Sequence, residues 1–102
     1  MNELQRQVDE LIEEFGGYWE PFEMLAALVE ELGELSEEIL KVEGVKGTGN
    51  RKRLEEEFGD VMFALACMAN HYGIDLVGAL KGSIEKYRKR DMARWARNKR
   101  GE

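Results

Sequence analysis

The feature that most constrains the fold is a set of segments in which apolar residues recur three or four residues apart, as they do on one face of an α-helix. The two longest stripes are Leu25, Leu28, Leu32, Leu35, Ile39 and Leu54, Phe58, Val61, Leu65, Met68, Tyr72. No segment alternates apolar and polar residues as a half-buried strand does. The pattern therefore predicts an all-α protein, a bundle of four helices.

Local signals give the ends of these helices. Pro21 suits the first position of a helix, Asn50 and Asp75 suit N-caps, and Gly16-Gly17 and Gly73 suit helix ends. The predicted helices run from about Glu3 to Phe15, from Pro21 to near Gly44, from about Arg51 to Tyr72, and from Leu76 into the nineties.

The length of 102 residues predicts one domain, residues 1–102. A domain of this size buries only about two-thirds of its unfolded surface. The third helix is apolar nearly all round over Val61–Ala69, which predicts that this segment is buried. A thin four-helix chain cannot cover all of that by itself, so we expect a homodimer or a homotetramer.

The cellular setting is also constrained. Cys67 is the only cysteine, so no intrachain disulfide can form, which fits a reducing compartment. The first residues lack the pattern of a signal peptide, and the longest apolar run has nine residues, too few to cross a bilayer. The sequence therefore predicts a soluble, cytoplasmic protein with no membrane partner.

The charge is unevenly distributed. Residues 1–80 hold 6 Lys and Arg against 18 Asp and Glu, a net charge of −12, whereas residues 81–102 hold 9 against 3, a net charge of +6. A nucleic-acid binder is usually basic over a whole face, so nucleic acid is an unlikely partner. The split suits a protein that binds a metal with carboxylates and a phosphate with cations. A solvated acidic body with a basic tail is the plainer alternative.

Two short acidic motifs lie on the second and third predicted helices. Glu30-Glu31-x-x-Glu34 lies on the second, and Glu57-x-x-Asp60 on the third. At 100° per residue, Glu31, Glu34 and Glu38 form a strip beside one apolar stripe, and Glu57 and Asp60 form a matching strip beside the other. If the stripes pack together, the acidic strips meet, while Glu30 points further from the core.

Converging carboxylates repel one another, so they hold protons or bind a cation. Oxygen-only ligands suit Mg²⁺, or Mn²⁺, rather than zinc. Gly33 and Gly59 stand directly beside Glu34 and Asp60, and each costs about 1 kcal/mol relative to alanine inside a helix. Such glycines permit close helix approach or leave room for a ligand. A charged flank engaged only in ion pairs remains the alternative.

At these residues the chain resembles the MazG-like nucleotide pyrophosphohydrolases, whose signature is EExxE, a variable spacer and ExxD. The spacer here has 22 residues. Flanking residues match as well, among them Tyr18-Trp19-Glu20-Pro21, and Lys86 to Asp91 with Arg94-Trp95 look like the short single-domain branch of the family. The resemblance covers nearly the whole chain.

The resemblance implies an all-α, oligomeric enzyme that cleaves the α–β phosphoanhydride of a nucleoside triphosphate with Mg²⁺, as part of nucleotide-pool house-cleaning. It implies that Glu31, Glu34, Glu57 and Asp60 bind the metal, with Glu30 as an outer member of the motif. Glu34, with Glu31 beside it, is our candidate for the carboxylate that orients or deprotonates a water.

Further residues are candidates for substrate binding. Lys86 and Arg90 match a basic pair that contacts phosphates in related enzymes, and Arg53 falls where a relative carries a lysine. Among the aromatic residues Tyr18, Trp19 and Phe22, Trp19 is the candidate for stacking on a base; holding the first helix against the second is the alternative.

Other functions are compatible with parts of the sequence. Cys67 and His71 are i,i+4 neighbours, but no third group completes a nucleophilic site. A non-catalytic helical interaction module with a surface acidic patch is the rival interpretation, and a helical nucleic-acid binder is a third. The sequence does not identify the nucleotide that is hydrolysed.

Overall fold

The computed structural model describes residues 2–99, apart from the side chains of residues 93 and 95–99. Four helices are present, α1 Glu3–Glu14, α2 Pro21–Val42, α3 Arg51–His71 and α4 Leu76–Lys99, and residues 2–99 contain no strand. The prediction of an all-α, four-helix protein is confirmed. The predicted ends differ from the observed ends by one or two residues, which is the usual scatter at helix termini.

The helix starts follow from local chemistry. Asn50 Oδ1 accepts a hydrogen bond of 2.8 Å from the backbone N–H of Arg53, and so caps α3. Glu20 and Glu23 form a capping box in front of α2, with Pro21 at the first helical position. Gly16 and Gly17 have φ angles of 105° and 108°, which only glycine adopts readily, and they separate α1 from the approach to α2.

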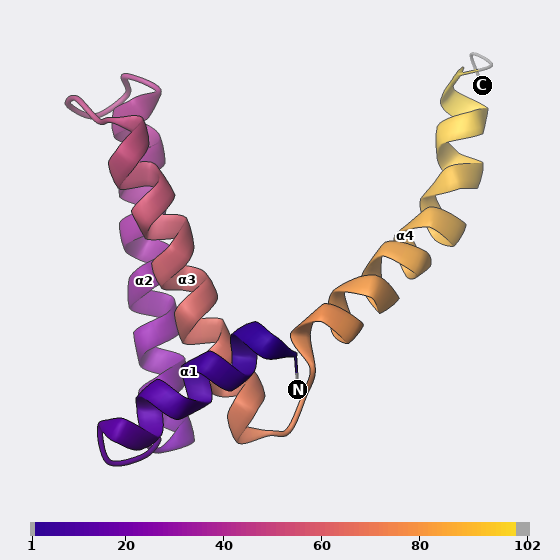
Figure 1. The fold of residues 1–102 in the computed structure, drawn as a ribbon. Coiled ribbons are helices and arrows are strands. Elements are labelled where there is room, and N and C mark those ends of the chain that lie inside the picture. Colours follow the sequence, from indigo (N-terminus) through magenta and orange to yellow (C-terminus); the bar gives the residue numbers. More distant parts are fainter. Residues whose placement is uncertain (1, 100–102) are drawn as a thin grey trace.

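The helices are arranged as an open V (Figure 1). α2 and α3 lie side by side along one arm, and α1 packs across the foot of this pair against α3. α4 leaves the other three helices and forms the second arm. The axis of the chain turns by 102° between α3 and the first part of α4. The α2–α3 pair is therefore the scaffold for any site that combines the two acidic motifs.

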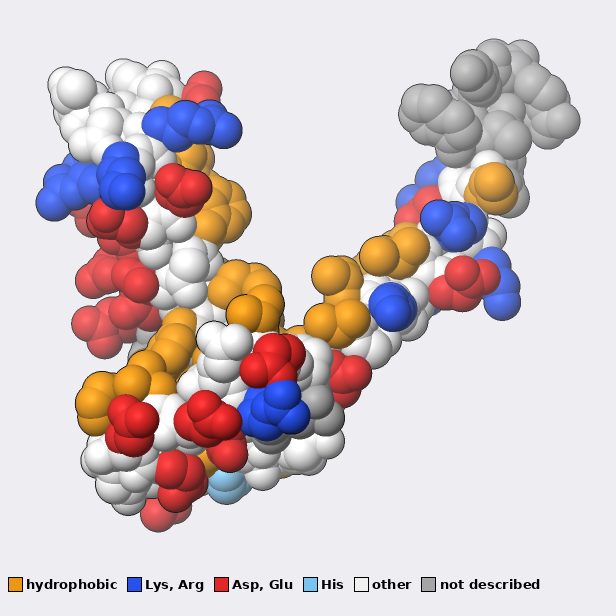
Figure 2. Space-filling model, in the orientation of Figure 1, with side chains coloured by type: hydrophobic (Ala, Val, Ile, Leu, Met, Phe, Trp, Pro, Cys, Tyr) orange, Lys and Arg blue, Asp and Glu red, His pale blue; other side chains and the backbone are white. Residues whose placement is uncertain are grey.

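Burial in one chain is limited. The buried apolar residues are Met24 on α2 and Ala66, Cys67 and Ala69 on α3. The apolar segment of α3 is only partly buried within one chain, because the Met62 side chain is 60% exposed and Phe63 and Leu65 are exposed as well. Apolar side chains follow the sides of both arms that face the open angle (Figure 2). One chain thus leaves much of its apolar stripes uncovered.

No single described helix is long and apolar enough to cross a membrane; α3 and the first part of α4 meet that test only together, across their bend.

Candidate metal and nucleotide site

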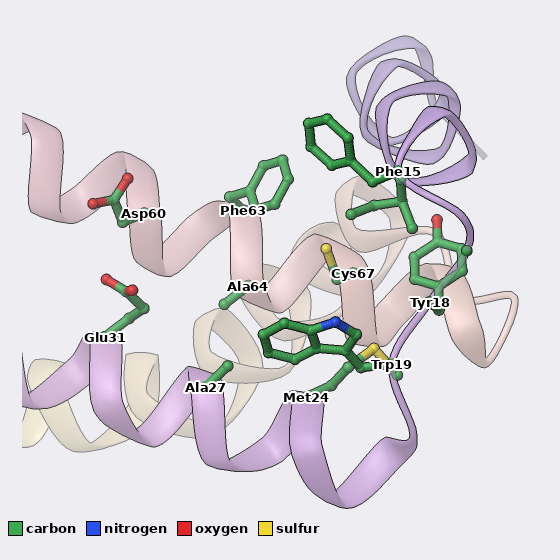
Figure 3. Close-up of a pocket in the computed structure, with 12 residues that line it drawn as sticks. Phe15, Tyr18, Trp19, Met24, Ala27, Glu31, Asp60, Phe63, Ala64 and Cys67 are labelled. Atoms are coloured by element: carbon green, nitrogen blue, oxygen red, sulfur yellow. The ribbon is translucent and has the colours of Figure 1, made fainter.

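Three carboxylates from two helices converge where α2 and α3 lie together. Glu31 of α2 and Glu57 and Asp60 of α3 each offer an oxygen within 4.8 Å of the other two. Glu31 and Asp60 face each other across the gap between the helices (Figure 3). We call these three residues the acidic cluster. The contact between α2 and α3 brings the two motifs together, although about half of each predicted apolar stripe, including Leu32 and Phe58, is exposed in one chain.

The electrostatics of the acidic cluster favour a cation. Burial raises the pKa of the Glu31 and Glu57 carboxyl groups, and the charges of Glu34 and Asp60 raise both further. One oxygen of each, Oε2, is shielded from solvent and has no hydrogen-bond partner among the described residues. An oxygen-only donor set with such orphaned oxygens fits a hard divalent ion, whose charge would offset the repulsion.

Glu34 and Glu30 lie at the edge of this arrangement. Glu34 is exposed, and its charge reaches both Glu31 and Glu57, although it is not among the three converging residues. Glu30 is exposed, as the helical wheel predicts. At Gly33 and Gly59 an added Cβ would meet no atom within 4 Å. Neither glycine therefore serves close helix approach within the chain, and the space beside the acids is open.

Glu38 does not join the acidic cluster, although it lies on the same helical strip as Glu31 and Glu34. It is 5% exposed, and its Oε1 accepts a hydrogen bond of 3.2 Å from the backbone N–H of Asn50. A Cβ on Gly49 would lie 2.9 Å from this oxygen and 2.8 Å from the backbone N of Val42. Glu38 and Gly49 thus hold the α2–α3 loop closely against α2. The helical period gives the face of Glu38 but not this partner.

A pocket of about 410 Å³ opens beside the acidic cluster. Glu31 and Asp60 lie at one end, and aromatic and other mostly apolar side chains make up the rest (Figure 3). The other lining side chains are Ile12, Phe15, Tyr18, Trp19, Met24, Ala27, Phe63, Ala64 and Cys67. We call this the aromatic pocket. Its volume lies in the range of small-molecule sites. Of its apolar members the sequence indicates only Tyr18 and Trp19 as ligand contacts, because the others look like ordinary core positions.

The aromatic residues Tyr18 and Trp19 of the α1–α2 connection and Phe22 at the start of α2 lie in two environments. Tyr18 and the 64% exposed Trp19 line the aromatic pocket, whereas Phe22 is 85% exposed and does not. Tyr18 donates a hydrogen bond to Asp9, and burial together with this bond raises the pKa of Tyr18 to about 12. Its hydroxyl is therefore neutral at physiological pH, and its ring is held as a fixed wall.

Cys67 and His71 do not form a catalytic pair in the structure. Cys67 is buried in the lining of the aromatic pocket, and burial raises the pKa of its thiol. The exposed His71 ring instead packs edge-on against Tyr72, with 4.8 Å between the ring centroids. A thiol of raised pKa without a base is a poor nucleophile.

The three candidate phosphate-binding cations occupy different places. Arg53, at the start of α3, lowers the pKa of Glu57 and so lies near the acidic cluster. Lys86 and Arg90 project from α4 over the Tyr87 ring, at 4.8 Å and 4.6 Å from its centroid. Because α4 forms the second arm of the V, a single chain does not bring this pair to the acidic cluster (Figure 1). The side chains beyond Arg94 lie outside the described residues.

Comparison with known proteins agrees with this geometry. The model of the MazG nucleotide pyrophosphohydrolase domain matches residues 20–95, which include both acidic motifs and the basic pair of α4. The chain is 42% identical over 105 residues to the protein YpjD of Bacillus subtilis (strain 168), covering 99% of this chain and 95% of that protein.

Two solved structures have similar folds. One is the Bacillus-conserved MazG protein, a nucleotide pyrophosphohydrolase, with a TM-score of 0.75 and 40% identity over 87% of this chain and 89% of that one. The other is YPJD from Bacillus subtilis, with a TM-score of 0.75 and 42% identity over 83% of this chain and 91% of that one. The chain therefore belongs to the MazG nucleotide pyrophosphohydrolase family and is an enzyme of that class.

Proposed function

We propose that the chain hydrolyses a nucleoside triphosphate to the monophosphate and pyrophosphate, with Mg²⁺ or Mn²⁺ as cofactor. The observation that carries the proposal is that the acidic cluster opens directly into the aromatic pocket. A triphosphate needs a cation, and a nucleoside needs an apolar, stacking surface. The two needs are met at the two ends of one cavity, which is the arrangement that a nucleotide requires.

We assign a proposed role to each side chain from its position. Glu31, Glu34, Glu57 and Asp60 would hold the metal, which when bound polarises phosphoryl oxygens and offsets their charge. Glu34, exposed beside Glu31, would orient a water and accept its proton. Trp19, at the rim of the aromatic pocket, would stack on the base, and Arg53 would contact the phosphates from the start of α3.

The size of the aromatic pocket gives a direct test of nucleoside binding. Ala27 and Ala64 line it from facing helices, and their small side chains leave the space open. We expect Ala64→Leu to raise KM for the nucleotide by about 10-fold or more, because the added methyl groups occupy the space of a base. Ala26→Leu, at an exposed position of α2, is the control. Unchanged kinetics in Ala64→Leu would place the nucleoside elsewhere.

Metal binding should appear as stabilisation that depends on pH. The pKa values of Glu31 and Glu57 are raised in the fold, so the folded state binds more protons than the unfolded chain above about pH 4.5. The metal-free protein should therefore lose stability as pH rises through the weakly acidic range. Mg²⁺ requires the ionised carboxylates and should offset this loss.

The measurement is the melting temperature with and without Mg²⁺ at pH 5 and pH 8, at matched ionic strength. We expect the Mg²⁺-induced increase to be larger at pH 8, and to be absent in Glu31→Gln. A melting temperature that Mg²⁺ leaves unchanged at both pH values would count against the metal site.

The assembly is the second part of the proposal. The apolar sides of the α2–α3 pair and of α4 face an open angle in one chain, and the body carries −12 against +6 on residues 81–102. A second copy would cover both apolar faces and would bring a basic α4 to an acidic body. We therefore propose a homodimer or a dimer of dimers, in which Lys86 and Arg90 reach the acidic cluster of a neighbouring copy.

Light scattering at micromolar concentration checks the assembly. A particle of two or four chains is expected because the exposed apolar stripes are too extensive for a stable monomer. A monomer under these conditions would refute the assembly and the shared site.

We also propose a cytoplasmic location. The only cysteine in the sequence, Cys67, is buried and forms no disulfide, which fits a reducing compartment.

A further inference from the structure

A buried amide ties α1 to the turn between α3 and α4. The Gln5 side chain is only 2% exposed. Its Nε2 donates hydrogen bonds of 2.9 Å to Asn70 Oδ1 and 2.8 Å to the carbonyl oxygen of Ile74. Its Oε1 accepts a hydrogen bond of 2.7 Å from the backbone N–H of Leu76, the first residue of α4. One side chain of α1 therefore binds both sides of the bend from which α4 departs.

Asn70 extends this chain of hydrogen bonds to the aromatic pocket. Its Nδ2 donates to the carbonyl oxygen of Gln5 at 2.9 Å and to the Tyr18 hydroxyl oxygen at 3.1 Å. Tyr18 donates in turn to Asp9 at 2.5 Å. Each polar atom of the Asn70 amide is thus engaged, so the amide can take only one orientation. An unbroken network runs from the pocket wall to the first turn of α4.

The polar character of this network needs a reason. An apolar residue at the contact of α1 with α3 would contribute hydrophobic stabilisation without the cost of burying an amide. A fully satisfied polar network instead selects one geometry, because any shift leaves a buried group unpaired. The geometry selected here includes both the position of the Tyr18 ring and the direction of α4.

We propose that Asn70 is a positioning residue of the nucleotide site. It holds Tyr18 as a fixed wall of the aromatic pocket and joins that wall, through Gln5, to the bend that directs α4. This inference rests on the proposed function, since it assigns the pocket to the nucleoside and α4 to the phosphates. Asn70 itself does not line the pocket, and it acts through Tyr18.

A double-mutant cycle tests this positioning role. Tyr18→Phe should raise KM about 10-fold and change kcat less than threefold, because the acidic cluster and the Gln5 contacts are untouched. Asn70→Leu should raise KM at least as much and should also lower kcat, because it loosens the hold of Gln5 on the bend of α4. In the double variant KM should rise no further than in Asn70→Leu alone, since both changes break the same contact. Tyr72→Phe, at an exposed tyrosine of the same region, is the matched control and should behave as wild type. Independent, multiplying effects on KM would overturn the proposal.

A readout without nucleotide separates this inference from the proposed function. Cys67 is the only cysteine and is buried in the pocket lining near Tyr18. Its reaction with a disulfide reagent such as DTNB should be at least 10-fold faster in Tyr18→Phe and in Asn70→Leu, with the helical circular dichroism intact. Asn70→Ala, which removes the donor to Tyr18 without adding volume, replaces Asn70→Leu if the latter does not fold.

The two measurements fail independently. If the wild-type chain hydrolyses no nucleotide, the proposed function fails, and the thiol rates alone decide whether Asn70 holds the pocket wall. Wild-type thiol rates in both variants would overturn the positioning role even in an active enzyme.

Discussion

Glu34→Gln and Asp60→Asn should each abolish pyrophosphate release, with a loss of roughly 1000-fold or more in kcat, while the helical circular dichroism stays intact. Each change keeps the shape of the side chain and removes the negative charge that would bind the metal or accept a proton. Asp60 is one of the three converging residues, and Glu34 lies close enough to raise the pKa of the other two. Removing one charge also relieves repulsion, so the metal-free variants should be no less stable than wild type.

Glu55→Gln is the matched control for this pair. Glu55 is exposed on α3 and does not belong to the acidic cluster. We expect it to retain activity within a factor of about 2, as surface substitutions usually do. Full activity in Glu34→Gln or Asp60→Asn would contradict the role of that residue in metal binding or proton transfer.

Arg90→Ala should lower kcat/KM by about 10- to 1000-fold, the value of one or two charge-assisted hydrogen bonds. Arg90 lies one helical turn from Lys86 on α4, so both cations point the same way. The acidic body repels a triphosphate, and these cations would stabilise the charge that builds in the transition state. Mg²⁺ stabilisation should be unchanged, because the arginine is not a ligand. Arg90→Lys should recover only part of the loss, since lysine lacks the bidentate fork.

Deletion of residues 97–102 is the control for position along the arm and should cost little activity, because it leaves Lys86 and Arg90 in place. If the truncated chain is inactive and Arg90→Ala keeps wild-type activity, the phosphate-binding group lies further along α4.

Mixed oligomers test whether this cation acts across chains. An Asp60→Asn chain would lack a proposed metal ligand and an Arg90→Ala chain the proposed phosphate-binding cation, yet a site that combines the intact parts of both would be complete. Mixing the two variants under conditions of subunit exchange should therefore raise the activity above the sum of their separate activities. No recovery, with exchange demonstrated, would mean that the arginine does not serve a neighbouring site.

The sequence predicts the local elements well because their signals are local. Asn50 caps α3 with its own side chain, and Pro21 begins α2, as the residue types at these positions indicate. The meeting of Glu31 with Glu57 and Asp60 also follows from helical spacing, once two long apolar stripes are assumed to pack.

The remaining features depend on tertiary structure. The direction of α4 depends on the conformation of the α3–α4 turn. Gln5 fixes this turn by accepting a hydrogen bond from the backbone N–H of Leu76, 71 positions later in the chain. The partnership of Asn70 with Tyr18 spans 52 positions. No periodicity marks a buried Gln or Asn whose partner is so distant in the chain, and the small Ala27 and Ala64 look like any core alanine. The aromatic pocket is thus visible only in three dimensions.

The products of hydrolysis test the central claim most directly. A panel of ribo- and deoxyribonucleoside triphosphates, including base-modified ones, is incubated with the wild-type chain and Mg²⁺, and products are separated by anion-exchange chromatography with Asp60→Asn as the blank. The account predicts monophosphate and pyrophosphate in equal amounts from at least one nucleotide, lost on chelation of the metal. Diphosphate and inorganic phosphate as the products, or hydrolysis that persists in excess chelator, would contradict it.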